Sequence, residues 1–180
     1  MTVGNSDGIL WKIIQGEKTN GRRFKSVGRR DCSERRKPIS GSVSSNTLTG
    51  IWKITTTYDQ FADGHKRDTW GKNPQGVVVF TPGGSFVFEL MSGDRAAKPG
   101  TIPPEPVGPA LAFYATYTTN DQNKTYTYHV EHSTFPQWNG ISRTSTVTEI
   151  SPTALKVTAE VVHDPQGGDF VPHLEFERIK

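Results

Sequence analysis

The chain has 180 residues, 33% of them hydrophobic and 10% aromatic, which is enough for one domain with a packed core. Its single cysteine, Cys32, excludes an internal disulfide and a cysteine-built metal site. No apolar run approaches the roughly 20 residues of a transmembrane helix, and no secretory signal opens the sequence, so we predict a cytoplasmic protein without membrane contact.

The first 45 residues differ in charge from the rest. The chain has 21 Lys and Arg against 18 Asp and Glu, a net charge of +3. Ten Lys/Arg and four Asp/Glu fall in residues 1–45, a net +6, which leaves −3 for the remainder. Such a polar segment buries too little surface to offset its ordering entropy, so residues 1–45 are predicted to be a disordered tail. A nuclear or anionic-surface signal, or partial ordering by a ligand, stays open. The mildly acidic remainder predicts no nucleic-acid surface on the folded domain.

From residue 46 onward, β-branched and aromatic residues alternate with polar ones between tight turns. Residues 82–84, 120–123 and 151–153 are predicted to join three hairpins. Residues 93–109 hold five Pro and three Gly and are predicted to form a long loop. The strands are predicted, in chain order, at residues 48–58, 75–81, 85–91, 110–119, 124–133, 141–150, 154–163 and 170–179.

Eight such strands with short up-and-down connections predict an all-β fold, an antiparallel barrel over residues 46–180. A closed eight-stranded barrel has no free edges, and its interior can hold one small ligand. A β-sandwich is the alternative architecture. Side chains that simply fill the barrel are the alternative to a cavity.

Four motifs resemble one family. Residues 48–52 (Leu-Thr-Gly-Ile-Trp) and 174–178 (Leu-Glu-Phe-Glu-Arg) are similar to the opening and closing strands of lipocalin and calycin barrels. Residues 74–84 and 128–140 resemble the second hairpin and the most distinctive segment of the bacterial and fungal lipocalin-like domain proteins. One departure is Tyr128-His129, where other members often have two histidines.

The resemblance implies that Trp52 plugs the barrel floor and that Arg178 packs across it. It also implies small single-domain proteins near natural-product biosynthetic genes, some of which act as cofactor-free isomerases, dehydratases or cyclases. Some of these are pericyclic catalysts of the Diels-Alder type.

The strand at residues 124–133 carries most of the candidate chemistry. One face has Tyr126, Tyr128 and His132, and the other has His129 and Glu131. The sequence leaves open which face lines the cavity. His129 and Glu131, at i and i+2, could act as a polarised base or be an exposed pair.

Two further residues near this strand are candidates. Arg143 could bind an oxyanion or carboxylate, or lie in a surface salt bridge. Trp138 could cover the cavity or anchor its loop.

The predicted site has two groups. The candidate catalytic residues are His129, His132, Tyr128, Glu131 and Arg143. The candidate ligand-binding residues, all aromatic, are Trp52, Tyr58, Phe86, Phe88, Tyr114, Tyr126, Trp138 and Phe176. The five histidines have no metal-ligand spacing, and nucleotide and serine-hydrolase motifs are missing, so neither a metal nor a cofactor is predicted.

The sequence therefore predicts a cofactor-free cyclase, isomerase or dehydratase of secondary metabolism, with an apolar, oxygenated small molecule as its partner. A non-catalytic carrier of a small hydrophobic ligand is the alternative. A filled barrel acting as an interaction protein, and a homodimer, stay open.

Overall fold

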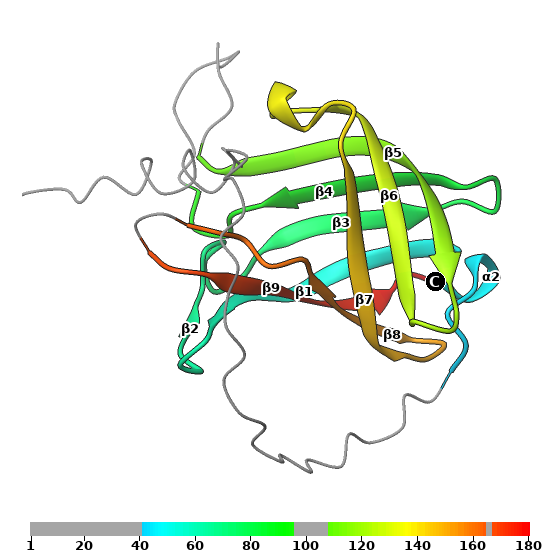
Figure 1. Cartoon of the computed structure of the whole chain (residues 1–180), viewed down its shortest axis with the longest axis horizontal. Helices are drawn as coiled ribbons and strands as arrows, with labels where there is room; N and C mark the ends of the chain where they lie inside the picture. The colour runs from blue at the N-terminus through cyan, green and yellow to red at the C-terminus, as the bar shows by residue number, and fades with distance from the viewer. Residues whose placement is uncertain (1–40, 96–107, 165–166) are drawn as a thin grey trace, which may run out of the picture.

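The computed structural model describes residues 41–95, 108–164 and 167–180, which form a barrel (Figure 1). Its strands, each antiparallel to its neighbours, are β1 (Gly50–Phe61), β2 (Lys66–Arg67), β3 (Gln75–Phe80), β4 (Ser85–Met91), β5 (Ala110–Asn120), β6 (Thr125–Ser133), β7 (Ser142–Ile150), β8 (Ala154–Ala159) and β9 (Phe170–Arg178). The ring runs from β1 through β3 to β9 and closes by β1–β9 pairing, with β2 as a short extra strand on β1. The predicted eight-stranded barrel is confirmed, and two stacked sheets are excluded.

The predicted hairpins are confirmed as β3–β4, β5–β6 and β7–β8. At the first turn Gly84 has a φ of +82°, which favours glycine, and its N–H donates to the Thr81 carbonyl at 3.1 Å. Two strand ends differ from the prediction by three residues or more: β1 extends to Phe61, and β8 ends at Ala159. Of the predicted loop at 93–109, residues 96–107 lie outside the described residues.

The alternation pattern does not predict two short helical segments, α2 (Ser45–Leu48) and the 3₁₀ turn η1 (Pro136–Trp138). Ser44 caps α2, and Val43 before it is fully buried and donates its N–H to Asp121 Oδ1 at 2.8 Å. Of the predicted tail, residues 1–40 lie outside the described residues. Within the described ranges, no helix is long and apolar enough to cross a membrane.

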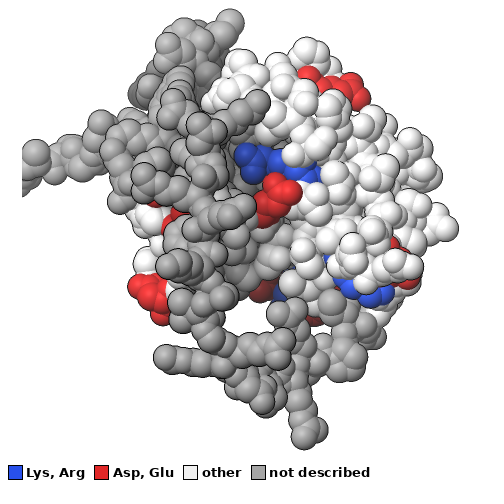
Figure 2. Space-filling view, viewed as in Figure 1, with Lys and Arg blue, Asp and Glu red and all other residues white. Residues whose placement is uncertain are grey.

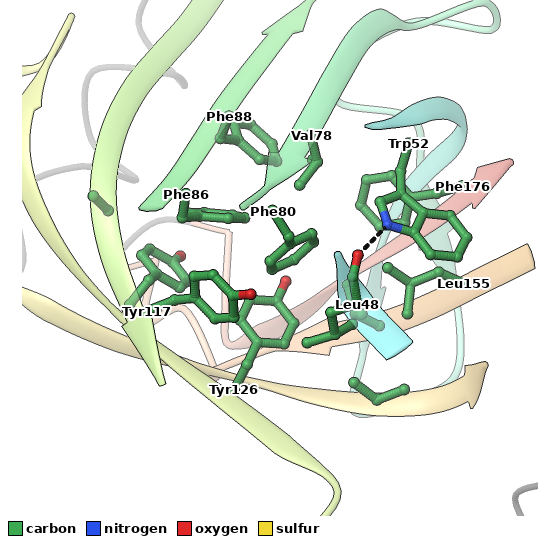
Figure 3. Close-up of a cluster of buried hydrophobic side chains, with 14 of the residues drawn as sticks. Leu48, Trp52, Val78, Phe80, Phe86, Phe88, Tyr117, Tyr126, Leu155 and Phe176 are labelled. Atoms are coloured by element: carbon green, nitrogen blue, oxygen red, sulfur yellow. Dashed lines mark hydrogen bonds between the residues drawn. The ribbon is translucent and has the colours of Figure 1, made fainter. Parts of the chain in front are cut away.

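Inward-facing aromatic side chains form the centre of the core (Figure 3). The Phe80 ring lies 4.8 Å from Phe86, 5.1 Å from Tyr117 and 5.2 Å from Tyr126, measured between centroids. These rings come from four consecutive strands, β3 to β6, which form two hairpins. The contacts of Phe80 with Tyr117 and Tyr126 therefore join the two hairpins across the barrel interior.

One end of the barrel is closed by Trp52, as the resemblance implied. Its indole N–H donates to the Leu48 carbonyl at 2.7 Å, and the Arg178 guanidinium lies 3.9 Å from the ring centroid. Arg178 also donates to the carbonyls of Thr49 at 2.6 Å, Thr47 at 2.8 Å and Pro152 at 2.8 Å. Arg178 thus joins α2, the start of β1 and the β7–β8 turn at this end.

The described parts of the long connections between the ring strands lie at the opposite end (Figure 1). They are residues 62–74 with β2, 92–95, 108–109, 134–141 with η1, 160–164 and 167–169. On the face shown in Figure 2, the charged side chains of the described residues are scattered, with Lys/Arg often close to Asp/Glu. The end away from Trp52 carries these connections and is called the open end below.

Two β-bulges reverse the alternation on which several predictions depended. In β1 the register shifts between Ile54 and Thr56, so Thr57, Asp59 and Phe61 are buried after the shift. Strict alternation from Trp52 would place Thr56 and Tyr58 inward, but Thr56 is exposed and Tyr58 is only half-buried. A bulge adds one residue to one strand and turns every later side chain to the other face.

In β6, Val130 pairs with Ala115 while His132 pairs with Tyr114, which leaves Glu131 as the extra residue. Tyr128 and Val130 are buried, but His132 is exposed on the outer face beside Tyr114. The sequence left open which face of this strand lines the cavity. Of the face that carries Tyr126, Tyr128 and His132, only the two tyrosines face inward. Tyr114 is also on the outer face, 47% exposed, so it does not line the interior.

Candidate ligand-binding cavity

The interior of the barrel holds a partly open cavity of about 150 Å³. Trp70, Phe135 and Trp138 line it from the connections at the open end, and Phe86 and Phe176 line it from the strands. A dry cavity of about this volume accommodates a molecule of roughly the size of benzene. The interior is therefore not completely filled by side chains.

Most of the predicted site residues border this cavity. Those that do so are Tyr58, Phe86, Phe88, Tyr126, Tyr128, Trp138, Arg143 and Phe176. Strand alternation after the β1 bulge places Tyr58 on the face opposite Asp59, and its ring stacks on His173 at 4.6 Å. Trp52 belongs to the closed end and is not part of the lining.

The other predicted residues lie on the outer surface. His129 is exposed, and its Nδ1 lies 3.1 Å from Ser142 Oγ. Glu131 and His132 are exposed at the bulge, and the Tyr114 ring lies 5.6 Å from that of His132. The structure thus brings Tyr128 and Arg143 together at the cavity and separates them from the two histidines and Glu131.

Stacked aromatic rings form one wall. The Phe113 ring lies 5.1 Å from Phe88 and 5.4 Å from Tyr128, nearly parallel to both, and 5.9 Å from Trp138. Phe113 was not among the predicted site residues; it is next to Tyr114 on β5 and therefore lies on the opposite, inward face. Flat apolar surfaces of this kind favour a ligand with an aromatic or conjugated body.

Two phenols extend this wall. Burial raises the pKa of Tyr126 to about 12, and a hydrogen bond with Ser145 acts in the opposite direction. Burial also raises the pKa of Tyr128, with smaller upward effects of Tyr126 and Glu160 and a downward effect of Arg143. Both phenols are therefore neutral at neutral pH and can donate or accept hydrogen bonds, but they are poor bases.

Arg143 enters the cavity because it pairs with Tyr128 across β6 and β7, and paired residues share a face. Its guanidinium carbon lies 4.8 Å from the Trp138 ring centroid. Among the described residues, Nε of Arg143 and Nε1 of Trp138 are both buried without a hydrogen-bond partner. Glu160 also borders the cavity and accepts the Thr144 backbone N–H at 2.9 Å.

Asp59 is a buried cavity-lining carboxylate that the sequence pattern did not indicate. It accepts a short hydrogen bond from the Thr69 hydroxyl and one from Arg67 Nη2 at 3.1 Å. Burial raises the pKa of Asp59, although the hydrogen bonds and the Arg67 charge act against that shift. Only the β1 bulge turns Asp59 inward, so a strict alternation pattern would place it outside.

Metal binding has no support in the described residues. Across residues 41–95, 108–164 and 167–180, no group of three His, Cys, Asp or Glu side chains could hold an ion. The predicted lack of a cofactor stays a prediction.

A family model matches the chain, and several solved structures are similar to it. No curated protein matches the chain. Among solved structures, a de novo designed fluorescence-activating β-barrel is similar at 15% identity and a TM-score of 0.40, covering 75% of this chain and 96% of its own. Bovine odorant-binding protein in complex with a selenium-containing odorant is similar at 12% identity and a TM-score of 0.40, covering 80% of this chain and 78% of its own. The model of the lipocalin-like domain family matches residues 49–171, and the chain therefore belongs to that family.

Proposed function

We propose that this protein binds a small, mainly apolar molecule that carries oxygen, in the cavity of the barrel. The observation that carries the proposal is the mainly apolar, partly open cavity at the end opposite Trp52, with a few polar groups on its wall. This combination is typical of small-molecule sites, in which apolar surface supplies most of the affinity and a few polar groups fix the orientation. The volume of about 150 Å³ limits the buried part of the ligand to about one ring.

A cavity-filling variant tests this function. Ala159 lines the cavity on β8, so the larger side chain of Ala159→Phe would occupy the space of the ligand. We expect toluene and cyclohexanone to bind the unmodified protein saturably, as followed by tryptophan fluorescence and calorimetry, and Ala159→Phe to abolish this binding.

Val87→Phe is the matched control, because Val87 is 41% exposed on the outer face. It adds the same ring outside the barrel and should leave binding unchanged. Thermal melting confirms that both variants fold. Equal binding by the two variants, or no saturable binding by the unmodified protein, would contradict the proposal.

Catalysis of a cyclisation, isomerisation or dehydration in secondary metabolism is a second candidate function. Cyclisation and isomerisation conserve atoms and dehydration releases only water, so the lining itself could supply the proton transfers. The observation that favours it is the buried Asp59 carboxyl, whose pKa is raised, together with the Tyr128 phenol and the Arg143 guanidinium on the same cavity. His129, Glu131 and His132 are exposed outside the cavity. We therefore propose Asp59, Tyr128 and Arg143 as the candidate catalytic residues.

Turnover assays separate the two candidates. Incubation with polyene and polyketide-like compounds should yield products of equal mass or of a mass lower by one water. We expect Tyr128→Phe and Asp59→Asn to reduce turnover by about tenfold or more while binding changes by less than about threefold. His132→Ala is the control outside the cavity. Parallel losses of binding and turnover would favour the carrier.

A further inference from the structure

We infer that the ligand carries an anionic oxygen group, such as a carboxylate, on a one-ring apolar body, and that Arg143 and Trp138 bind this group. The inference rests on the proposed binding function and specifies its ligand class. It starts from two neighbouring N–H donors on the cavity wall, Nε of Arg143 and Nε1 of Trp138. Both are buried and without a hydrogen-bond partner among the described residues. Buried donors are nearly always paired in folded proteins, so two adjacent unpaired donors indicate a position for an acceptor.

The arrangement of the two side chains is fixed by their surroundings. Arg143 faces inward through its register with Tyr128. The Trp138 ring holds the guanidinium by a cation–π contact at 4.8 Å and is itself packed 5.9 Å from Phe113. Both donors are therefore positioned before a ligand arrives, which reduces the entropy cost of binding.

The local charge favours an anion at Arg143. Within the described ranges, no carboxylate oxygen forms an ion pair with its guanidinium. Glu160, which also borders the cavity, is exposed and accepts the Thr144 N–H, so water screens its charge more than that of the half-buried Arg143. The guanidinium is also close enough to Tyr128 to lower the pKa of that phenol against the larger effect of burial. A carboxylate at this place would gain charge-assisted hydrogen bonds from a planar donor.

Asp59 and Phe113 define the rest of the ligand. Asp59 places a carboxylate on another strand of the same cavity, so an anionic group is disfavoured there and favoured at Arg143. The stacked rings of Phe88, Phe113 and Tyr128 offer a flat apolar surface next to Trp138. An aromatic acid would match both features at once.

Three probes of nearly equal size test the inference on the full chain: benzoate, benzyl alcohol and benzylamine. At neutral pH they present an anion, a neutral hydroxyl and a cation on the same ring. By calorimetry we expect benzoate to bind at least about tenfold more tightly than benzyl alcohol, and benzylamine to bind most weakly. Arg143→Met should remove the preference for benzoate and change benzyl alcohol binding by less than about threefold. Trp138→Phe, which keeps an aromatic ring but removes the N–H, should weaken benzoate binding selectively.

Lys53→Met is the control for charge, because Lys53 is exposed on the outer face of β1 and its loss changes the net charge equally. If benzyl alcohol binds as tightly as benzoate, the inference is wrong and the binding function stands. If none of the probes binds, the proposed function fails and the inference fails with it. If Arg143→Met does not fold, the three probes with the unmodified protein and with Trp138→Phe still test the inference.

Discussion

At the scale of single residues, burial sets the chemistry of the two cavity phenols. The side chains of Tyr126 and Tyr128 are buried, and this burial raises the pKa of each phenol. The alternation of β6 predicted that both share a face, so aromatic lining was readable from the sequence. A strict alternation pattern would place Asp59 outside and His132 on the face of the two tyrosines. Both residues depart from it, because each follows a bulge whose extra residue is set by the partner strand.

Ionisation of Tyr126 should lower the stability of the protein at alkaline pH. Its pKa is about 12 in the folded state against an ordinary value of 10.0 for tyrosine. Because the folded pKa is higher, the contribution to stability is complete below pH 10 and is lost as the pH rises through 12. We expect about 2–3 kcal/mol of the free energy of unfolding to be lost in this window, measured by urea denaturation. Tyr126→Phe should reduce this pH dependence, and ionisation of Tyr126 at its ordinary pKa, seen by phenolate absorbance, would contradict the account.

Arg178 is the residue whose replacement should most weaken the closed end. Arg178→Lys keeps the charge but cannot reach the carbonyls of Thr47, Thr49 and Pro152 together. We expect a loss of roughly 2–4 kcal/mol in the free energy of unfolding. Lys180, exposed two residues later, provides the control Lys180→Met, which should cost less than about 0.5 kcal/mol. Similar urea midpoints for the two variants would contradict this role.

At the scale of elements, hairpins were predictable and bulges were not. Turn residues and alternation are local signals, and they located β3–β4, β5–β6 and β7–β8 within a few residues. A bulge depends on which residue of the partner strand is opposite, so the shifts in β1, β6 and β7 leave no local signal. For the same reason the sequence identified the lining aromatics better than the polar groups beyond each bulge.

Gly76 in β3 is required by close packing rather than by its backbone angles. A Cβ there would lie 2.1 Å from the Glu89 carbonyl oxygen and 2.9 Å from Ile54 Cδ1. The β3–β4 ladder would have to move, so Gly76→Ala should destabilise the protein by about 2–4 kcal/mol. Gly83→Ala is the matched control, since its nearest heavy atom, Thr81 Oγ1, is 4.0 Å away. Thermal melting of the two variants side by side tests the claim; an equal shift in Tm would contradict it.

At the scale of the whole molecule, the closed ring was predictable because its eight strands are all antiparallel and sequential. The presence of a cavity was not predictable. It depends on how far Phe80, Phe86 and their neighbours fill the interior, which is a property of packing in three dimensions.

We propose that residues 41–180 fold independently of the preceding segment. The strand ring, the Trp52 plug and the described cavity wall are built within this range. Removal of residues 1–40 should therefore change the free energy of unfolding by less than about 1 kcal/mol. Removal of residues 1–48, which also takes the buried Val43 and Leu48, should cost about 3 kcal/mol or more. A large loss of stability on removal of residues 1–40 alone would contradict the proposal.

The two ends of the barrel also differ in what can be attached to them. Arg178 is hydrogen-bonded at the end closed by Trp52, and Lys180 lies close behind it near α2 (Figure 1). A dye, affinity tag or sensor surface coupled after Lys180 would therefore be remote from the Trp138 loop. When the barrel is immobilised in this orientation, its open end faces the solution. Small-molecule ligands could then be screened on a sensor chip without steric interference from the coupling group.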